Sequence, residues 1–249
     1  MAEKVVLITG AGRGIGAACA LLAAQQGYVV CVNYHSKHEA AAAVCDAIAQ
    51  EGGDAFAIQA DVSDEAEVER MFAAIDSRFD RLDALVNNAG ILAPQMRVEQ
   101  MTAARLQRVF ATNVTGSFLC AREAVRRMST RHGGTGGAIV NLSSRAAVLG
   151  SPGEYVDYAA SKAAVDALTI GLSKEVAAEG IRVNGVRPGL IYTEMHASGG
   201  EPARVERLKS AVPMGRGGEP AEVAGAVLWL LSDQASYTTG SFIDVSGGR

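Results

Sequence analysis

The sequence predicts an α/β fold, in which a three-layer, doubly wound parallel β-sheet lies between two layers of helices. Three observations lead to this prediction. Short apolar segments typical of strands alternate with helical segments along the whole chain. The strand segments are apolar almost throughout, as expected when helices cover both faces of a sheet. No proline-rich linker, charge run or shift in composition divides the 249 residues, so we expect one domain over 1–249.

The first predicted element is a compact apolar strand at residues 5–9, which ends in a cluster of glycines. Small and aliphatic residues follow at 15–26 and predict a helix that packs on the sheet. The order of strand and helix then repeats twice. We expect strands at 29–33 and 55–59, and helices at 39–50 and 65–79.

The second half of the chain continues the alternation. A fourth strand is expected at 82–86, followed by helical stretches over 103–128, which the glycines at 133–137 end. Further strands are expected at 138–142, 182–186 and 242–245, and further helices at 156–178 and 221–231.

One long irregular segment interrupts this pattern. Glycines, prolines and mixed polar residues over 188–218 surround a short helical stretch at 203–209. Insertions of this length in a compact domain are usually functional loops, so we expect a substrate loop around 189–218.

The composition argues against several classes of partner. A net charge of −4 provides no broad positive field for nucleic acid or an anionic membrane. The start of the chain lacks a signal-peptide pattern, and no apolar stretch has the length of a membrane span. We therefore expect a cytoplasmic protein that acts on a small molecule.

The four cysteines lie in apolar or alanine-rich surroundings. They form no CxxC pair and have no histidine at metal-ligand spacing. We expect buried, reduced thiols and no metal site. The residues are Cys19, Cys31, Cys45 and Cys120.

The glycine cluster after the first strand is the first candidate binding site. It reads TGAGRGIG from Thr9 to Gly16 and stands between a predicted strand and a predicted helix. Glycines let the backbone approach a pyrophosphate, and the amides of a helix start carry partial positive charge. This context predicts a dinucleotide-binding, Rossmann-type domain, although the spacing differs from the common GxGxxG. A glycine-rich turn without a ligand is the alternative.

Two further motifs follow in order: Asn87, Asn88, Ala89 and Gly90 after the fourth strand, and later the pair Tyr158-x-x-x-Lys162. With the glycine loop, they resemble the classical short-chain dehydrogenase/reductase family over essentially the whole chain. The pattern is most similar to bacterial sugar (glucose) dehydrogenase-like and ketoacyl reductase-like members. The resemblance implies hydride transfer between a nicotinamide cofactor and a carbonyl or secondary alcohol, such as a ketone, aldehyde or sugar.

Tyr158 and Lys162 lie four residues apart in a predicted helix, so their side chains share one face. A nearby ammonium favours a phenolate, and we expect Lys162 to lower the Tyr158 pKa. The resemblance implies that Tyr158 transfers the proton and that Lys162 tunes it. An ordinary helix surface is the alternative for an isolated pair of this kind.

The resemblance implies two more catalytic residues. Ser144 matches the serine that bonds the substrate carbonyl, but Ser143 remains open, because the fourteen positions from Ser144 to Tyr158 exceed the usual spacing by one. Asn113 matches a residue that holds a water in a proton relay. Its alternative is a buried polar residue bonded to the backbone of a bend.

The second strand is expected to select the cofactor at its end. An acid there would bind the ribose 2′-hydroxyl of NAD and repel the 2′-phosphate of NADP. No carboxylate is present, and Arg13 adds a cation from the glycine loop, so we predict NADP(H). A solvated Arg13, an NAD-preferring dehydrogenase and a non-catalytic NADP-binding regulator are the alternatives. The strand ends in Asn33, Tyr34, His35, Ser36 and Lys37.

The resemblance also implies the other cofactor contacts. Asp61 and Val62 are expected at the adenine, although Asp61 has the alternative of capping the next helix. Lys162 is expected at the nicotinamide ribose and Thr193 at the carboxamide. The expected set is Gly10, Gly12, Arg13, Gly14, Ile15, Gly16, Asn33, Tyr34, His35, Ser36, Asp61, Val62, Asn88, Ala89, Gly90, Tyr158, Lys162, Pro188, Gly189, Ile191 and Thr193.

The substrate loop offers a mixed wall from Tyr192, Met195 and His196, which suits a small polar or aliphatic carbonyl compound. We expect His196 to bond to solvent rather than to act as a catalyst. The segment 239–245 resembles the one that family members use in packing subunits, which implies a homotetramer.

An arginine group in the middle of the chain is a weak candidate for binding an acidic carrier protein. A solvated helix face is the preferred interpretation. The group is Arg122, Arg126, Arg127 and Arg131.

Overall fold

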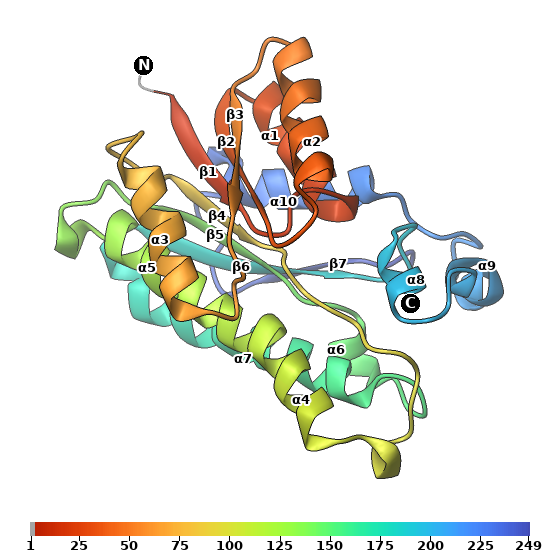
Figure 1. Cartoon of the computed structure of the whole chain (residues 1–249). Coiled ribbons are helices and arrows are strands. Elements are labelled where there is room, and N and C mark those ends of the chain that lie inside the picture. Colours follow the sequence, from red (N-terminus) through yellow and green to blue (C-terminus); the bar gives the residue numbers. More distant parts are fainter. Residues whose placement is uncertain (1–2) are drawn as a thin grey trace.

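The computed structural model describes residues 3–249 and forms one seven-stranded parallel sheet with helices on both faces (Figure 1). The strand order is β3-β2-β1-β4-β5-β6-β7, so the order reverses between β1 and β4. The predicted doubly wound, Rossmann-type fold is confirmed. The strands are β1 Lys4–Ile8, β2 Tyr28–Tyr34, β3 Ala55–Gln59, β4 Ala84–Asn87, β5 Gly137–Leu142, β6 Ile181–Pro188 and β7 Phe242–Val245.

Side chains that alternate along each strand build a core on each side of the sheet. Val6 and Ile8 of β1 join a cluster with the first helix layer, whereas Val5 and Leu7 join a cluster with the second. Figure 1 shows the two layers on opposite sides of the sheet. The first layer contains α1 Gly14–Gln25, α2 His38–Gln50 and α10 Pro220–Leu231, and the second contains α3 Glu65–Asp76, α5 Gly116–Met128 and α7 Val156–Val176.

The region 103–128, where helical stretches were predicted, contains two helices joined by an irregular turn. It divides into α4 Ala103–Phe110, a π-helical turn Ala111–Thr115 and α5. The ends of the elements also differ from the prediction by a few residues, as at β6, which continues to Pro188. The remaining helices are short, namely α6 Ala146–Leu149, α8 Met195–Ser198 and α9 Arg204–Leu208.

The 3₁₀ turns link these elements and lie outside the cores. They are η1 Val98–Gln100, η3 Thr130–His132, η4 Ala177–Glu179, η5 Lys209–Ala211 and η6 Asp233–Ala235. In residues 3–249 no helix is both long and apolar enough to cross a membrane.

The cysteine side chains are free thiols. Cys19, Cys31 and Cys120 are buried as predicted, but Cys45 of α2, which packs against the core, is only half-buried, and this corrects the prediction for that residue. Burial raises the pKa of the Cys19 and Cys120 thiols to about 12.

Candidate active site

Two adjoining cavities open at the carboxyl ends of the strands, the larger across the point between β1 and β4 where the strand order reverses, and the smaller at the ends of β5 and β6. This is where doubly wound sheets bind ligands. The larger cavity has a volume of about 830 Å³ and the smaller about 440 Å³. They share the lining residues Ile15, Asn88, Leu92, Thr193 and Met195.

The glycine loop forms the floor of the larger cavity. Gly10 and Gly14 have φ values of +63° and +55°, a region that favours glycine. The Gly10 amide donates to Asn33 Oδ1 at 3.1 Å, so buried Asn33 holds the loop in place. A Cβ at Gly16 would lie 2.5 Å from the Gly10 carbonyl oxygen.

Gly16 was expected to contact the cofactor, but it lines neither cavity. Because α1 packs so closely on the loop at this residue, Gly16 determines how near the start of the helix comes to the cavity. The structure shows a packing role for Gly16, and its contact with a cofactor stays a prediction.

The larger cavity fits an extended, negatively charged dinucleotide. Within the described residues, no side chain caps the start of α1 and no acidic residue lies in its first turn, so the helix-start amides are available to a pyrophosphate. Its lining includes the predicted residues Gly10, Gly12, Arg13, Gly14, Ile15, Asn33, Tyr34, His35, Ser36, Asp61, Val62, Asn88, Ala89, Gly90 and Thr193.

Asp61 does not cap the helix that follows it, and that alternative is wrong. Asp64 caps α3, since its side chain accepts a hydrogen bond from the Glu67 amide. Asp61 instead accepts hydrogen bonds from the amide and hydroxyl of Ser63. Burial raises the Asp61 pKa, but these bonds and the charge of His35 outweigh it and lower the pKa.

The smaller cavity holds the predicted chemical residues. Tyr158, Lys162, Pro188, Gly189 and Ile191 line it and not the larger cavity. The Lys162 ammonium lies 5.8 Å from the centre of the Tyr158 ring and donates to the Leu142 carbonyl at 2.7 Å.

The two serines after β5 have different surroundings. Ser143 is buried, and its hydroxyl donates to the Lys162 carbonyl at 3.1 Å. Ser144 is hydrogen-bonded to the Tyr158 side chain and accepts a bond from the Ala146 amide. Of the two serines, Ser144 therefore has the position expected for a group that binds a carbonyl beside Tyr158.

The pKa of Tyr158 changes in the opposite direction from the one expected. Burial raises it to about 12, and the hydrogen bond with Ser144 only partly opposes this effect. Burial lowers the Lys162 pKa to about 8, against the charge of Asp166. The prediction of a lowered Tyr158 pKa is wrong for the protein without cofactor, because the loss of water outweighs the hydrogen bond with Ser144.

Asn113 lies fully buried in the π-helical turn. Its Oδ1 accepts from the Ile91 amide at 2.7 Å, and its Nδ2 donates to the Ile91 carbonyl and to Ser161 Oγ. These bonds match the alternative of a buried polar residue bonded to backbone. They hold the loop after Gly90 against α7, and the water relay remains a prediction.

His196 was expected to bond to solvent, but in the structure it contacts the protein backbone. Its Nε2 lies 3.0 Å from the Ile191 carbonyl, and its Nδ1 is buried without a hydrogen-bond partner in the described residues. Burial lowers the His196 pKa. His196 is therefore neutral at neutral pH, and it lines the smaller cavity, as do Tyr155 and Leu149.

Several lining residues of the larger cavity were not predicted. Glu194 and Ser198 belong to the substrate loop, and the others lie near the residues that the motifs identified. Only the position of Glu194 directly after Thr193 offers a sequence signal. The other residues are Ala40, Ala60, Ser63, Ile91, Leu92, Pro94, Arg108, Ala111 and Thr112.

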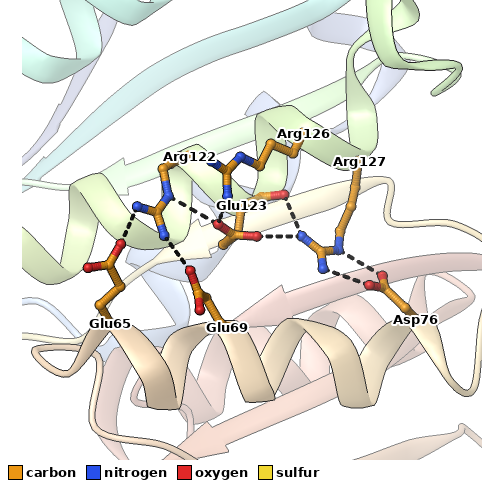
Figure 2. Close-up of polar contacts among 7 residues, drawn as sticks. All are labelled: Glu65, Glu69, Asp76, Arg122, Glu123, Arg126 and Arg127. Carbon is orange, nitrogen blue, oxygen red and sulfur yellow. Dashed lines mark hydrogen bonds and ion pairs between the residues drawn. The ribbon is translucent and has the colours of Figure 1, made fainter.

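Most of the arginine group forms an ion-pair network between α3 and α5 (Figure 2). Arg122 pairs with Glu65, Glu69 and Glu123. Arg127 pairs with Glu123 and with Asp76, and the Arg127 side chain is 20% exposed. These two arginines lie on a partly solvated helix face, as preferred, but ion pairs hold their side chains in place.

The other two arginines of the group are more exposed. Arg126 pairs with Glu123, and Arg131 with Glu179. Every arginine of the group thus has an acidic partner within the chain.

Comparisons with known proteins agree with this geometry. A family model described as "Enoyl-(Acyl carrier protein) reductase" matches residues 10–249. The "Uncharacterized oxidoreductase YgfF" of Escherichia coli (strain K12) is 65% identical, over 98% of this chain and 99% of the relative. The "3-oxoacyl-[acyl-carrier-protein] reductase FabG" of Staphylococcus aureus (strain Mu50 / ATCC 700699) is 41% identical, over 98% and 97%.

A solved structure is similar over nearly the whole fold. The crystal structure of a short-chain type dehydrogenase/reductase from Mycobacterium marinum has a TM-score of 0.92 and 38% identity, and the match covers 98% of this chain and 94% of that one. The chain therefore belongs to the short-chain dehydrogenase/reductase family and is an oxidoreductase that acts on CH–OH or keto groups.

Proposed function

We propose that the protein is an NADP(H)-dependent reductase of small, free carbonyl compounds, namely ketones, aldehydes or sugars. The observation that carries the proposal is the meeting of Ser144, Tyr158 and Lys162 in a small cavity that adjoins a dinucleotide-sized one. The position of Thr193 and Asn88 on both cavities supports transfer between two ligands held side by side.

Tyr158 is the proposed proton donor. When bound, the reduced nicotinamide supplies a hydride to the carbonyl carbon. Ser144 orients the carbonyl oxygen, and the Tyr158 hydroxyl gives that oxygen its proton. With its pKa raised, the Tyr158 hydroxyl is protonated at neutral pH, which is the form that donates a proton. Lys162 stabilises the phenolate that forms, since its charge lies 5.8 Å from the ring centre.

NADP(H) is the proposed cofactor because the rim of the larger cavity carries cations where an acid would select NAD. Arg13, Lys37 and Ser36 line this rim and suit a 2′-phosphate. The FabG relatives, named as 3-oxoacyl-[acyl-carrier-protein] reductases, support the reduction of a keto group.

A free substrate is proposed rather than a carrier-bound one. The arginine group that was the candidate for an acidic carrier protein is paired with Glu65, Glu69, Asp76, Glu123 and Glu179. Since an acidic protein would meet these carboxylates together with the arginines, the group offers little net attraction.

The function is tested by following NADPH oxidation with a panel of ketones, aldehydes, diketones and sugars. The panel also includes a 3-oxoacyl group, both free as a thioester and on a carrier protein. We expect turnover on free carbonyl compounds. Tight NADPH binding without turnover on any compound favours the non-catalytic regulator, and turnover only on the carrier-bound group contradicts a free substrate.

Replacing Tyr158 by Phe removes the proton that the reaction needs. We expect kcat to fall by about 10²-fold or more, while the Kd for NADPH changes little. Activity within a few fold of the wild type would show that another group donates the proton.

We also propose that the protein is a homotetramer, as the family resemblance implies. Exposed apolar side chains on the outer faces of α4, α5 and α7 support packing against a second copy. These are Leu106, Phe110, Phe118 and Ile170.

A further inference from the structure

A single carboxylate bridges the two walls of the larger cavity. Glu194 lies directly after Thr193 at the start of the substrate loop, and its Oε2 lies 2.8 Å from Arg13 Nη1. The same oxygen lies 3.8 Å from Lys37 Nζ. All three side chains line the cavity. The cations proposed to bind the 2′-phosphate therefore share an acidic partner within the chain.

Glu194 is the acid on this lining that competes for those cations. The other lining carboxylate, Asp61, bonds to Ser63 and pairs with His35. The hydrogen bond from Arg13, with the charges of Arg13 and Lys37, lowers the Glu194 pKa. Glu194 is therefore ionised at neutral pH and repels any anion that approaches the two cations.

The Arg13–Glu194 pair is open to solvent and exchangeable. The two side chains are 45% and 65% exposed, and exposed pairs of this kind contribute little to stability. A phosphate dianion offers more charge and more acceptor oxygens to the same cations than one carboxylate does. Such an anion can displace Glu194. Part of its binding free energy is then lost, because the ion pairs of Glu194 with Arg13 and Lys37 must first break.

We propose that Glu194 is a specificity-determining residue that acts as an internal competitor of the cofactor 2′-phosphate. This proposal rests on the proposed NADP(H) function. Glu194 weakens the binding of phosphorylated cofactors and leaves the binding of unphosphorylated ones nearly unchanged.

The test replaces Glu194 by Gln and measures the Kd of NADPH and of NADH by fluorescence titration, without substrate. We expect NADPH to bind about 3- to 10-fold more tightly to E194Q, and NADH to change by less than about 2-fold. The gain should shrink in high salt, because it comes from exposed charges. Adenosine 2′,5′-bisphosphate and 5′-AMP, which lack nicotinamide, should repeat this contrast.

Glu99→Gln is the matched control. Glu99 pairs with Arg97 at 2.8 Å on the surface and lines neither cavity, so the variant removes the same charge from a similar pair. We expect it to leave both Kd values unchanged. In an Arg13→Ala background, E194Q should lose most of its effect on NADPH, because the competition passes through Arg13.

The outcomes separate this inference from the proposed cofactor. If the wild type binds NADH as tightly as NADPH, the NADP(H) preference fails, yet E194Q must still strengthen NADPH binding alone. If E194Q leaves NADPH binding unchanged, or changes NADPH and NADH equally, the role of Glu194 is overturned whatever the wild-type preference.

Discussion

Burial governs the two titrating side chains at the centre of the candidate site. Loss of water raises the pKa of Tyr158 to about 12 and lowers that of Lys162 to about 8. Both changes favour the neutral form of the side chain. The helical spacing of the pair was readable in the sequence, but their desolvation depends on segments that come from elsewhere in the fold.

The pKa of Lys162 leads to a prediction for stability. Because this pKa falls from 10.5 to about 8 on folding, the unfolded chain binds more protons between these values. The free energy of unfolding contributed by Lys162 therefore rises as the pH rises from about 8 to 10. Lys162→Met should lack this contribution. Urea denaturation at several pH values measures how the free energy of unfolding changes with pH in the wild type and in the variant. The same pH dependence in both would contradict a lowered Lys162 pKa.

The two serines after β5 show what motif spacing can and cannot predict. Spacing indicated that a serine after β5 faces Tyr158, but it left Ser143 and Ser144 open. In the structure Ser143 bonds to the Lys162 carbonyl and Ser144 to Tyr158. The choice depends on which side of the chain each residue faces as β5 ends, and a gap length does not determine that.

Replacing each serine by Ala should therefore affect different properties. We expect Ser144→Ala to lower kcat by about 10²-fold with little change in stability. Ser143→Ala should keep kcat within a few fold and lower the free energy of unfolding by about 1 kcal/mol, since a buried hydrogen bond is lost. Steady-state kinetics and urea denaturation of both variants check this, and a reversed pattern would exchange their roles.

At the scale of elements, a buried ion pair joins α4 to the start of α7. Arg105 Nε lies 2.7 Å from Asp157 Oδ2, with side chains 8% and 1% exposed. Arg105 also donates to the Pro94 carbonyl at 2.6 Å. Asp157 directly precedes Tyr158 in the first turn of α7, so this ion pair fixes the turn that carries the tyrosine. The partners are 52 residues apart, and no sequence pattern connected them.

Asp157→Asn should destabilise the protein strongly, because it leaves the Arg105 charge buried without its partner. We expect the free energy of unfolding to fall by about 3 kcal/mol or more, measured by chemical denaturation. Glu99→Gln breaks an exposed pair and should cost less than about 1 kcal/mol. Similar losses in the two variants would argue that water reaches the Arg105–Asp157 pair.

The elements themselves were largely predictable. Near-continuous apolar strands and alanine-rich helices gave periodic patterns that tertiary contacts did not overrule. The π-helical turn Ala111–Thr115 was not predicted, since its residues look like ordinary helix in the sequence. Its cause is tertiary: Asn113 bonds to the backbone of Ile91 on a neighbouring loop.

At the scale of the whole molecule, the sheet and the site at its carboxyl ends followed from alternation and motif order. The contacts that close the cavities did not. Arg13 and Glu194 are 181 residues apart, and their meeting depends on the conformation of an irregular loop. Periodicity carries no information on such a loop, so sequence reasoning identified its presence without its contacts.

The proposed homotetramer is tested at the exposed apolar face of the second helix layer. Phe118 on α5 is 49% exposed, and a charge there should oppose packing against another copy. We expect the wild type to run as a tetramer in gel filtration with light scattering, and Phe118→Glu as a smaller species. Val98→Glu, at an exposed valine outside these helices, should remain a tetramer. A monomeric wild type would contradict the proposal.

Residues far apart in the chain, from Gly10 to Ser198, line the larger cavity, and this has a consequence for synthesis on the ribosome. The glycine loop emerges among the first residues, whereas Thr193, which contacts Gly14, emerges only after most of the chain has been made. A nascent chain that holds β1 to β4 therefore has the floor of the cavity without its far wall. Translation must therefore pass the substrate loop before the polypeptide can enclose a dinucleotide in this cavity.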